Sequence, residues 1–411
     1  MPWKYRLNSA QQFRSPVNYQ PKPFGIATII ALLLLLSLMQ LSFPFSTAQM
    51  TPTATSVSPS LFAEVSGQAE AITTDKDGNV YASLFLQRTI VKITPDGTVS
   101  QIATIAVPEP PLGFFAAILG LVVNDAGDIL VGDTACQCIM KVTQDGEVSA
   151  YSSSGITVPN GLVLHDGFLY VGDTVPGEIY RIPEGGGEPE LVSDHDLLTA
   201  HAEGAFGGAD GLVFDQHGNL FVTNVGDGNI IKITMEDGVA INVEIFGEPG
   251  AFRGADGITI DDAGNLIIAE NQVNTISALT PDGQRIVIMT SLDSDGSTGL
   301  LEAPTDVAFH EKKIYISNAD FAGGVNSATE APFTISLIEV NIPGSLLNRM
   351  DQLEGKFESV SAFHSQWENR PHTFMYEFST PTGNIDYYRV QFFDGPGGSA
   401  NGATFVSVLV K

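Results

Sequence analysis

Short runs of alternating apolar and polar residues, separated by turns that contain glycine, recur along the chain. Residues 208–222 are a clear example, because two apolar runs flank the turn formed by residues 215–219. A copy of this pattern covers residues 254–268. Period-2 alternation is typical of half-buried β-strands, and a recurring unit of about 45 residues is typical of solenoids and propellers.

Six such units can be aligned on their turns. They begin near residues 70, 119, 160, 210, 256 and 305. The sixth unit has only three clear strand-like runs, and an additional run at residues 61–65 precedes the first unit. A linear array would leave unpaired strands at its ends, whereas a ring lets the early strand complete the last sheet. The sequence therefore predicts an all-β, six-bladed β-propeller over residues 61–344.

The two ends of the chain do not follow the repeat. Residues 1–48 combine a basic start, a long apolar run and a small-x-small site. This pattern predicts a signal peptide and a secreted or periplasmic protein, with an uncleaved membrane anchor as the alternative. Residues 49–60 read as a polar linker. Residues 345–411 predict a small C-terminal extension with an amphipathic helix near residues 346–360 and three strands.

The chain is strongly acidic, with 47 acidic and 19 basic residues. This charge argues against binding to nucleic acid or to an anionic membrane surface. Most carboxylates are expected to be solvated, and a minority could hold a cation. The two cysteines, Cys136 and Cys138, are expected to be free thiols, because residues i and i+2 of a strand lie near the distance limit for a disulfide.

One position at the start of the innermost strand recurs in every unit. In chain order its occupants are Glu70, Leu119, Asn160, Asp210, Asp256 and Thr305. In a propeller these residues converge at one mouth of the central channel. Four of them offer carboxylate or amide oxygens, and crowded carboxylates repel each other unless a cation lies between them. The pattern favours an oxygen-lined metal site, with calcium as the first choice.

A second acidic position recurs at the hairpin turns. Asp75, Asp215 and Asp261 each begin a turn that ends in Gly-Asn. An Asp side chain at such a position can accept hydrogen bonds from backbone amides further along the turn. These three residues are therefore expected to be structural and not part of a site.

These motifs resemble the SMP-30/gluconolactonase/luciferin-regenerating-enzyme family, which is similar in turn to NHL-repeat propellers. The resemblance implies that Glu70, Asp210 and Asp256 hold a divalent metal, calcium first and zinc or manganese as alternatives. It implies that Asn160 contacts the substrate and that Asp256 is also the catalytic acid/base. Two positions depart from the family pattern: Asp210 replaces an amide, and Val158 stands where the family often has a substrate-binding Arg.

The activity implied by the resemblance is metal-assisted hydrolysis of a cyclic ester, as in sugar-lactone lactonases. Long loops at residues 106–118, with Phe114 and Phe115, and at residues 193–207 are expected to shape the pocket. His201 in the second loop is interpreted as an ordinary loop histidine. Two other classes stay open: a non-catalytic NHL-like propeller that binds a protein or glycan, and a strictosidine-synthase-like or lyase enzyme.

Overall fold

The structure is a computed structural model. It describes residues 59–113, 115–291, 300–311, 313–321, 325, 326, 329 and 331–339, and the backbone of three later strands. The predicted signal peptide, nearly all of the linker and the predicted helix at residues 346–360 lie outside the described residues. In the described part of the chain, no helix has the length and apolar character needed to span a bilayer.

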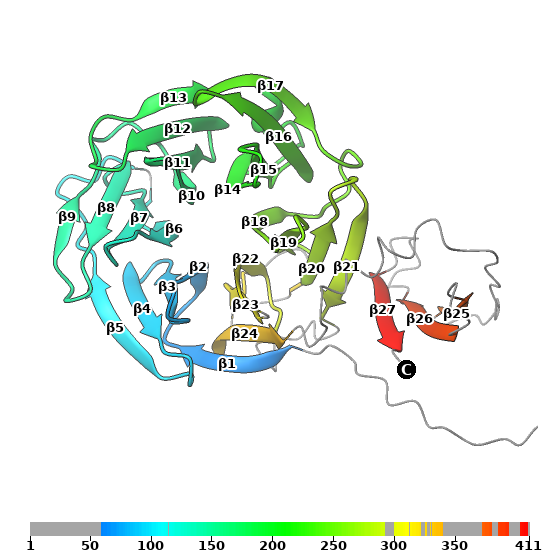
Figure 1. Cartoon of the computed structure of the whole chain (residues 1–411). Helices are drawn as coiled ribbons and strands as arrows, with labels where there is room; N and C mark the ends of the chain where they lie inside the picture. The colour runs from blue at the N-terminus through cyan, green and yellow to red at the C-terminus, as the bar shows by residue number, and fades with distance from the viewer. Residues whose placement is uncertain are drawn as a thin grey trace, which may run out of the picture. The chain divides into compact units, whose positions relative to one another are not determined.

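Six antiparallel sheets of four strands surround a central axis, which confirms the six-bladed propeller (Figure 1). The innermost strands are β2 (Ala69–Thr74), β6 (Ile118–Val123), β10 (Pro159–His165), β14 (Ala209–Phe214), β18 (Ala255–Ile260) and β22 (Pro304–His310). The second strands are β3 (Val80–Leu84), β7 (Ile129–Asp133), β11 (Phe168–Asp173), β15 (Leu220–Asn224), β19 (Leu266–Glu270) and β23 (Lys313–Asn318). The third strands are β4 (Thr89–Ile93), β8 (Cys138–Val142), β12 (Glu178–Pro183), β16 (Asn229–Glu236), β20 (Thr275–Leu279) and β24 (Phe333–Glu339). The outermost strands are β5 (Val99–Thr104), β9 (Val148–Ala150), β13 (Glu190–Ser193), β17 (Val239–Ile245), β21 (Arg285–Thr290) and β1 (Ser60–Val65).

The ring closes through the strand that precedes the first blade. β1 pairs antiparallel with β24, so the last sheet has the order β1-β24-β23-β22. The ring of Phe62 in β1 packs edge-on against Tyr315 in β23, with the centroids 4.9 Å apart. The closure predicted from residues 61–65 is confirmed, and it joins the beginning of the propeller to its end.

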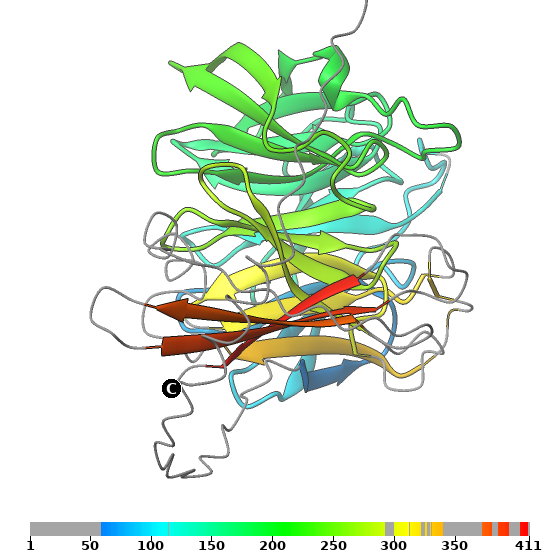
Figure 2. The same ribbon diagram turned by 90° about the vertical axis from the view of Figure 1, so that its right-hand side faces the viewer.

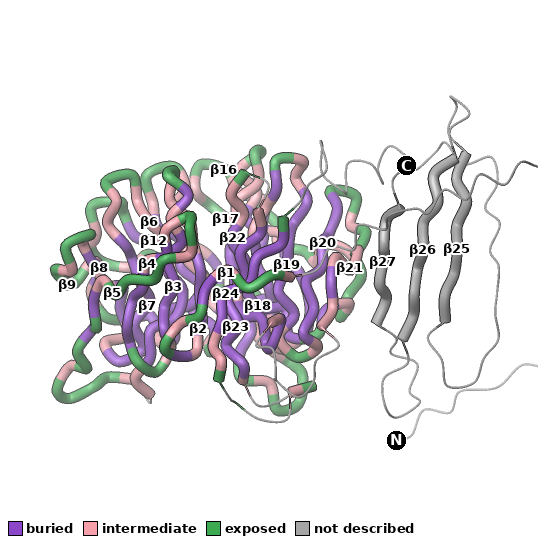
Figure 3. Tube along the Cα trace, turned by 90° about the horizontal axis from the view of Figure 1, so that it is seen from below, coloured by how far each residue is buried: buried purple, intermediate pink, exposed green. Residues whose placement is uncertain are grey.

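The hydrophobic core lies largely between neighbouring blades. One cluster joins Tyr81 and Ile90 of the first blade to Ile118 and Val131 of the second. Burial decreases outward, because β3 is buried along its whole length whereas β5 is mostly exposed (Figure 3). Strands covered on both faces need apolar residues on both, which explains the nearly continuous apolar runs of the second strands.

The hairpin turns between the first and second strands use their Asp residues as predicted. Asp215 Oδ1 accepts hydrogen bonds from the backbone amides of His217 and Asn219, both at 2.8 Å. Asp75 and Asp261 accept the equivalent bonds in their own turns. These carboxylates therefore shape the repeat, and they lie at the ends of the innermost strands opposite to the candidate site.

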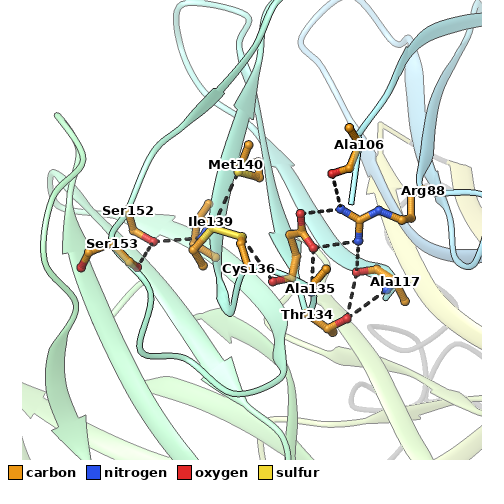
Figure 4. The surroundings of a disulfide bond; sticks show 12 residues. Arg88, Ala106, Ala117, Thr134, Ala135, Cys136, Ile139, Met140, Ser152 and Ser153 are labelled. Atoms are coloured by element: carbon orange, nitrogen blue, oxygen red, sulfur yellow. Dashed lines mark hydrogen bonds and ion pairs between the residues drawn. A yellow bond between two sulfur atoms is a disulfide. The ribbon is translucent and has the colours of Figure 1, made fainter. Parts of the chain in front are cut away.

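The prediction of free thiols is wrong, because Cys136 and Cys138 form a disulfide (Figure 4). Cys136 lies in the turn between β7 and β8, and the intervening Gln137 has a positive φ of 54°. This left-handed residue bends the chain, so the two Cα atoms lie 5.2 Å apart. A regular strand would separate them by roughly 6.6 Å, and the assumption of such a strand caused the error.

Three strands beyond the propeller form a small sheet of their own. They are β25 (His372–Ser379), β26 (Ile385–Phe393) and β27 (Ala403–Leu409), orange to red in Figure 2. They pair antiparallel in the order β25-β26-β27. The three strands predicted for the C-terminal extension are thus present.

Candidate functional site

The six residues predicted to converge all occupy the second position of an innermost strand, and all are buried. They are Glu70 in β2, Leu119 in β6, Asn160 in β10, Asp210 in β14, Asp256 in β18 and Thr305 in β22. We call this set the ring. The face of the propeller at which it lies is called the mouth face.

A β-bulge at the start of each innermost strand sets the direction of the ring residue. In β14, Ala209 pairs with Asn224 but the next paired residue is Leu212, so Asp210 and Gly211 stay out of the ladder. A register shift follows the first residue of the other five strands as well. Bulges re-aim side chains and release backbone groups from the ladder. The released carbonyls of the ring residues are then free to bond to neighbouring blades.

Hydroxyl side chains from neighbouring blades hold ring residues in place. Thr223 Oγ1 in β15 donates a hydrogen bond of 2.5 Å to the backbone carbonyl of Asp256. Ser317 Oγ in β23 donates to the carbonyl of Glu70 at 2.9 Å, and Thr305 Oγ1 donates to the same oxygen at 2.6 Å. The hydroxyl of Thr305 therefore bonds to the backbone of a ring residue. The carboxylates of Glu70, Asp210 and Asp256 and the amide of Asn160 are the side chains that remain for binding or catalysis.

The glycine that follows most ring residues is required by the close approach of neighbouring strands. A Cβ atom on Gly161 would lie 2.0 Å from the carbonyl oxygen of Asp210. A Cβ atom on Gly120 would lie 1.9 Å from the carbonyl oxygen of Asn160. The repeated Asn-Gly and Asp-Gly pairs thus combine a polar side chain with the small residue that lets the strands pack tightly around the channel.

The ring separates two hollow spaces. On the mouth side lies a cavity of about 670 Å³, and below the ring lies a narrower channel of about 210 Å³. Glu70, Asn160, Asp210 and Asp256 line both spaces. These four residues therefore form the floor of the mouth cavity, where a small molecule entering from the mouth face would meet them.

The ring carboxyls raise one another's pKa. Burial raises the pKa of Glu70 to about 8, and the charges of Asp210 and Asp306 add to this effect. Burial, followed by the charge of Asp306, raises the pKa of Asp210 to about 8. The pKa of Asp256 is raised by burial and then by the charges of Asp210 and Glu70. At neutral pH the metal-free ring therefore retains protons, which a bound cation would displace.

Sequence reasoning missed Asp306, the neighbour of the ring residue Thr305. Asp306 lines the channel below the ring and accepts hydrogen bonds from the backbone amides of Ile72 at 3.0 Å and Val307 at 2.8 Å. Burial raises its pKa to about 7, and these two hydrogen bonds oppose the shift. A signal was present, because the other five units have Gly or Ala at this position.

Asn271 was missed as well. Its Nδ2 donates a hydrogen bond of 2.6 Å to Oδ2 of Asp256, and its side chain lines the mouth cavity. The bond lowers the pKa of Asp256 against the larger effect of burial. Asn271 lies in the turn between β19 and β20. The equivalent turns of the other blades differ in composition, so the repeat gave no reason to select it.

The donor set of the floor fits a hard cation. Oε2 of Glu70 is buried and has no hydrogen-bond partner in the structure. Carboxylate oxygens of Asp210 and Asp256 and the amide of Asn160 line the same space, and calcium prefers such oxygen ligands. Within the described residues no group of three His, Cys, Asp or Glu side chains is arranged as a preformed metal site. The floor thus offers oxygen ligands that suit a cation, and their side chains would have to move closer together to coordinate one.

One side of the mouth cavity is apolar. Leu119, the aliphatic member of the ring, belongs to a buried cluster with Val158, and Phe85 and Phe115 pack against this cluster. Val158 is therefore a packing residue and supplies no charge to the cavity. Among the described residues that line the cavity, Arg253 is the one cationic side chain, and it lies in the loop between β17 and β18.

The loop between β13 and β14 is held by a histidine. His201 is exposed, and its Nδ1 lies 2.8 Å from Oδ2 of Asp227. Oδ1 of Asp227 accepts a hydrogen bond from the backbone amide of His201 at 2.7 Å. Hydrogen bonds to Asp227 and Asp196 raise the pKa of His201. These contacts fit the interpretation of His201 as a loop residue. Phe114, in the other long loop, lies outside the described residues.

Comparison with known proteins gives one family match. The model of the SMP-30/Gluconolactonase/LRE-like region matches residues 120–247. A comparison with curated proteins found no match. The family match covers nearly all of the second blade and all of the third and fourth, and it therefore includes Asn160 and Asp210 of the ring.

Solved structures show the same fold at low sequence identity. The calcium-binding protein regucalcin from Agrobacterium tumefaciens is 16% identical, with a TM-score of 0.52, over 69% of this chain and 94% of that one. A gluconolactonase from Xanthomonas campestris is also 16% identical, with a TM-score of 0.52, over 71% of this chain and 93% of that one. The predicted family resemblance is thereby confirmed: residues 120–247 match the model of the SMP-30/Gluconolactonase/LRE-like region, and they lie within a six-bladed β-propeller.

Proposed function

We propose that this protein is a divalent-metal-dependent hydrolase that opens cyclic esters at the floor of the mouth cavity. The observation that carries the proposal is the convergence of Glu70, Asp210 and Asp256 with Asn160 at the base of one cavity. Oε2 of Glu70 is buried there without a hydrogen-bond partner. A propeller that served only as a scaffold would gain nothing from crowding buried carboxylates, which destabilises the fold unless a cation compensates.

The ring residues have separate roles in this proposal. Glu70, Asp210 and Asp256 would hold the cation, with calcium as the first candidate and zinc or manganese as the others. A bound divalent cation would polarise the ester carbonyl and stabilise the negative charge that develops on its oxygen. Asn160, at the same floor, has an amide that can orient the substrate by hydrogen bonding.

Asp256 is the proposed acid/base. Its Oδ2 accepts a hydrogen bond from Asn271, which restrains the orientation of the carboxyl group. In its ionised form the Asp256 carboxylate would take a proton from the attacking water, and it would return that proton to the leaving alkoxide. Asn271 thereby acts as a positioning residue.

The proposal includes export of the protein. Its support is the amino-acid pattern of residues 1–48, a basic start followed by a long apolar run and a small-x-small site. An uncleaved segment that anchors the propeller to a membrane is the alternative. Gel mobility and N-terminal sequencing of the protein recovered from the host's medium, periplasm and membranes would distinguish the two.

The hydrolase proposal is tested with metal-depleted protein. Hydrolysis of glucono-δ-lactone and of simple γ-lactones is followed with a pH indicator, first after chelation and then with calcium, zinc or manganese restored. We expect chelation to abolish activity and one ion to restore it. We expect Asp256→Asn to lower kcat by roughly 100-fold or more, because it removes the acid/base.

The matched control is Asp125→Asn, which removes an exposed carboxylate from a turn on the opposite face. This variant should keep wild-type kcat. Activity that survives both chelation and Asp256→Asn would overturn the proposal. So would a metal-bound protein that hydrolyses none of the lactones.

A further inference from the structure

We infer that the mouth cavity is built for a substrate with a large apolar substituent and not for a polyhydroxylated sugar lactone. This inference deepens the proposed hydrolase function and, for the substrate class, depends on it. The observation behind it is an aromatic wall beside the ring, formed by Phe85, Phe115, Phe206 and Phe321. All four side chains line the mouth cavity.

The four rings of the wall form one continuous surface. The centroids of Phe85 and Phe321 are 5.5 Å apart, and those of Phe85 and Phe115 are 6.3 Å apart. Phe206 continues the series, with its centroid 6.3 Å from that of Phe115. These separations lie in the range of favourable aromatic pairs, so the wall is a packed surface and not a chance grouping.

The wall meets the floor at the apolar part of the ring. Phe85 and Phe115 pack against Leu119 and Val158, so the apolar side reaches the ring itself. Polar side chains line the rest of the cavity: Arg253, Asn271 and Gln272 beside the fifth blade, and Thr174 and Glu203 beside the third and fourth. An ester carbonyl at the carboxylates would therefore place one substituent of its ring directly against aromatic carbon.

The hydroxyl groups of a sugar lactone are poorly suited to the aromatic side of the cavity. A sugar lactone carries a hydroxyl on nearly every ring carbon, and each hydroxyl that faced Phe85 or Phe115 would lose its hydrogen bonds to water without replacement. The loss for each unpaired hydroxyl is on the order of tenfold in affinity. An alkyl or aryl substituent would instead gain from leaving water.

Phe206 is the most informative member of the wall. Its side chain is 60% exposed although it is large and aromatic. Its loop is tied down, because Asp227 accepts hydrogen bonds from the backbone amides of His201 at 2.7 Å and Ala202 at 2.8 Å. A loop held at its start keeps Phe206 at the edge of the cavity, where a bound apolar group would cover it.

Exposed apolar side chains gather on the same face. Among the described residues, eleven large hydrophobic side chains are exposed, and those that lie in loops instead of strands all belong to the mouth face. They are Leu86, Val107, Leu112, Val175, Phe206 and Val325. The others lie in the outer strands β1, β5, β13 and β17. Of these six, Phe206 lines the cavity, and the other five lie in loops of the same face.

The test measures binding and turnover separately. The substrates are γ-lactones with a methyl, propyl, pentyl or heptyl side chain, with glucono-δ-lactone as the polyhydroxylated comparison. The binding probes are the γ-lactams with the same side chains, which resist hydrolysis, measured by calorimetry. We expect lactam affinity and kcat/KM for the lactones to rise about twofold to fourfold for each added methylene.

Two variants assign the effect to the wall. Phe206→Ala should reduce the affinity that the heptyl lactam gains over the methyl lactam by about tenfold, and Phe206→Leu should restore part of that gain. Because Phe206 is largely exposed, both variants are expected to fold. Leu191→Ala in β13, which removes a side chain that is 53% exposed on an outer strand, should behave as the wild type.

The outcomes separate this inference from the proposed function. Lactam affinity that rises with side-chain length, in a protein that hydrolyses no lactone, would support the apolar site and overturn the hydrolase. Lactone hydrolysis that is independent of side-chain length, or fastest with glucono-δ-lactone, would support the hydrolase and overturn the apolar site. A length dependence that Phe206→Ala leaves unchanged would also overturn the assignment to this wall.

Discussion

Replacing Asp210 by Asn is expected to stabilise the metal-free protein at alkaline pH. Asp210 is buried in the ring, and no side-chain or backbone donor in the described structure bonds to its carboxylate. Burial and the charge of Asp306 raise its pKa from 3.8 to about 8. The substitution removes the charge that those surroundings disfavour and leaves a side chain of nearly the same shape.

The magnitude follows from proton linkage. The folded protein keeps the Asp210 proton up to about pH 8, whereas the unfolded chain loses it near pH 4. The contribution of the protonated Asp210 carboxyl to the free energy of unfolding is therefore fully present below pH 4. This contribution is lost as the pH rises through the folded pKa. The difference between the two pKa values corresponds to about 6 kcal/mol at high pH, of which about 5 kcal/mol is expressed at pH 8. The buried amide of the Asn costs about 1–3 kcal/mol when it lacks partners.

Asp210→Asn should therefore raise the free energy of unfolding of the metal-free protein by about 2–4 kcal/mol at pH 8, and its effect at pH 5 should be close to zero or negative. For a domain of this size the increase at pH 8 corresponds to a rise in Tm of roughly 5–10 °C. The assay is thermal unfolding in a chelator between pH 5 and pH 9, with wild type and variant measured side by side. The signature is a difference in Tm that grows as the pH rises.

The exposed carboxylate Asp125 provides the matched control, and Asp125→Asn should change Tm by less than about 2 °C at every pH. The reasoning would be refuted if Asp210→Asn lowered the Tm at pH 8, or if its effect did not change with pH. Either result would mean that the ring carboxylates are not electrostatically crowded in the metal-free protein.

Three further substitutions test the scaffold and the cavity. Gly161→Ala should destabilise the protein by about 3 kcal/mol or more, measured by chemical denaturation, because its Cβ would lie 2.0 Å from the carbonyl oxygen of Asp210. Arg88→Met should cost about 3–5 kcal/mol in the same assay, because Arg88 forms a buried ion pair with Asp133 at 2.7 Å that links the first two blades (Figure 4). Arg253→Met should raise KM for a lactone that carries a carboxylate by about tenfold and leave KM for a neutral lactone within about twofold, because Arg253 is the cation of the cavity in the described structure.

The architecture was predictable because the repeat encodes it several times over. Five of the six units place a small residue directly after the ring residue, and three place an Asp of the hairpin turn five residues after it, so the ring could be aligned without coordinates. The strand predicted at residues 61–65 had no partner before it, and the sixth unit lacked a strand. Closure of the ring followed from these two facts together.

The features that sequence reasoning missed are those that depart from the repeat. Asp306 is displaced by one position from the ring, where the other five units have Gly or Ala, and the structure places it in the channel below the ring. Asn271 reaches Asp256 from a turn whose composition varies among the blades. The Cys136–Cys138 disulfide depends on the left-handed conformation of the residue between them, which no pattern of hydrophobicity reports.

The central claim is that the ring binds a divalent cation, and calorimetric titration of chelator-treated protein with calcium tests it most directly. Run near pH 7 in buffers of different ionisation enthalpy, the titration should give one site per chain and release of at least one proton, because the raised pKa values of Glu70 and Asp210 mean that the ion displaces protons. Glu70→Gln and Asp256→Asn should each weaken binding by about tenfold or more, whereas Asp125→Asn should not. Absence of binding for calcium, zinc and manganese, or binding that survives both ring substitutions unchanged, would contradict the account.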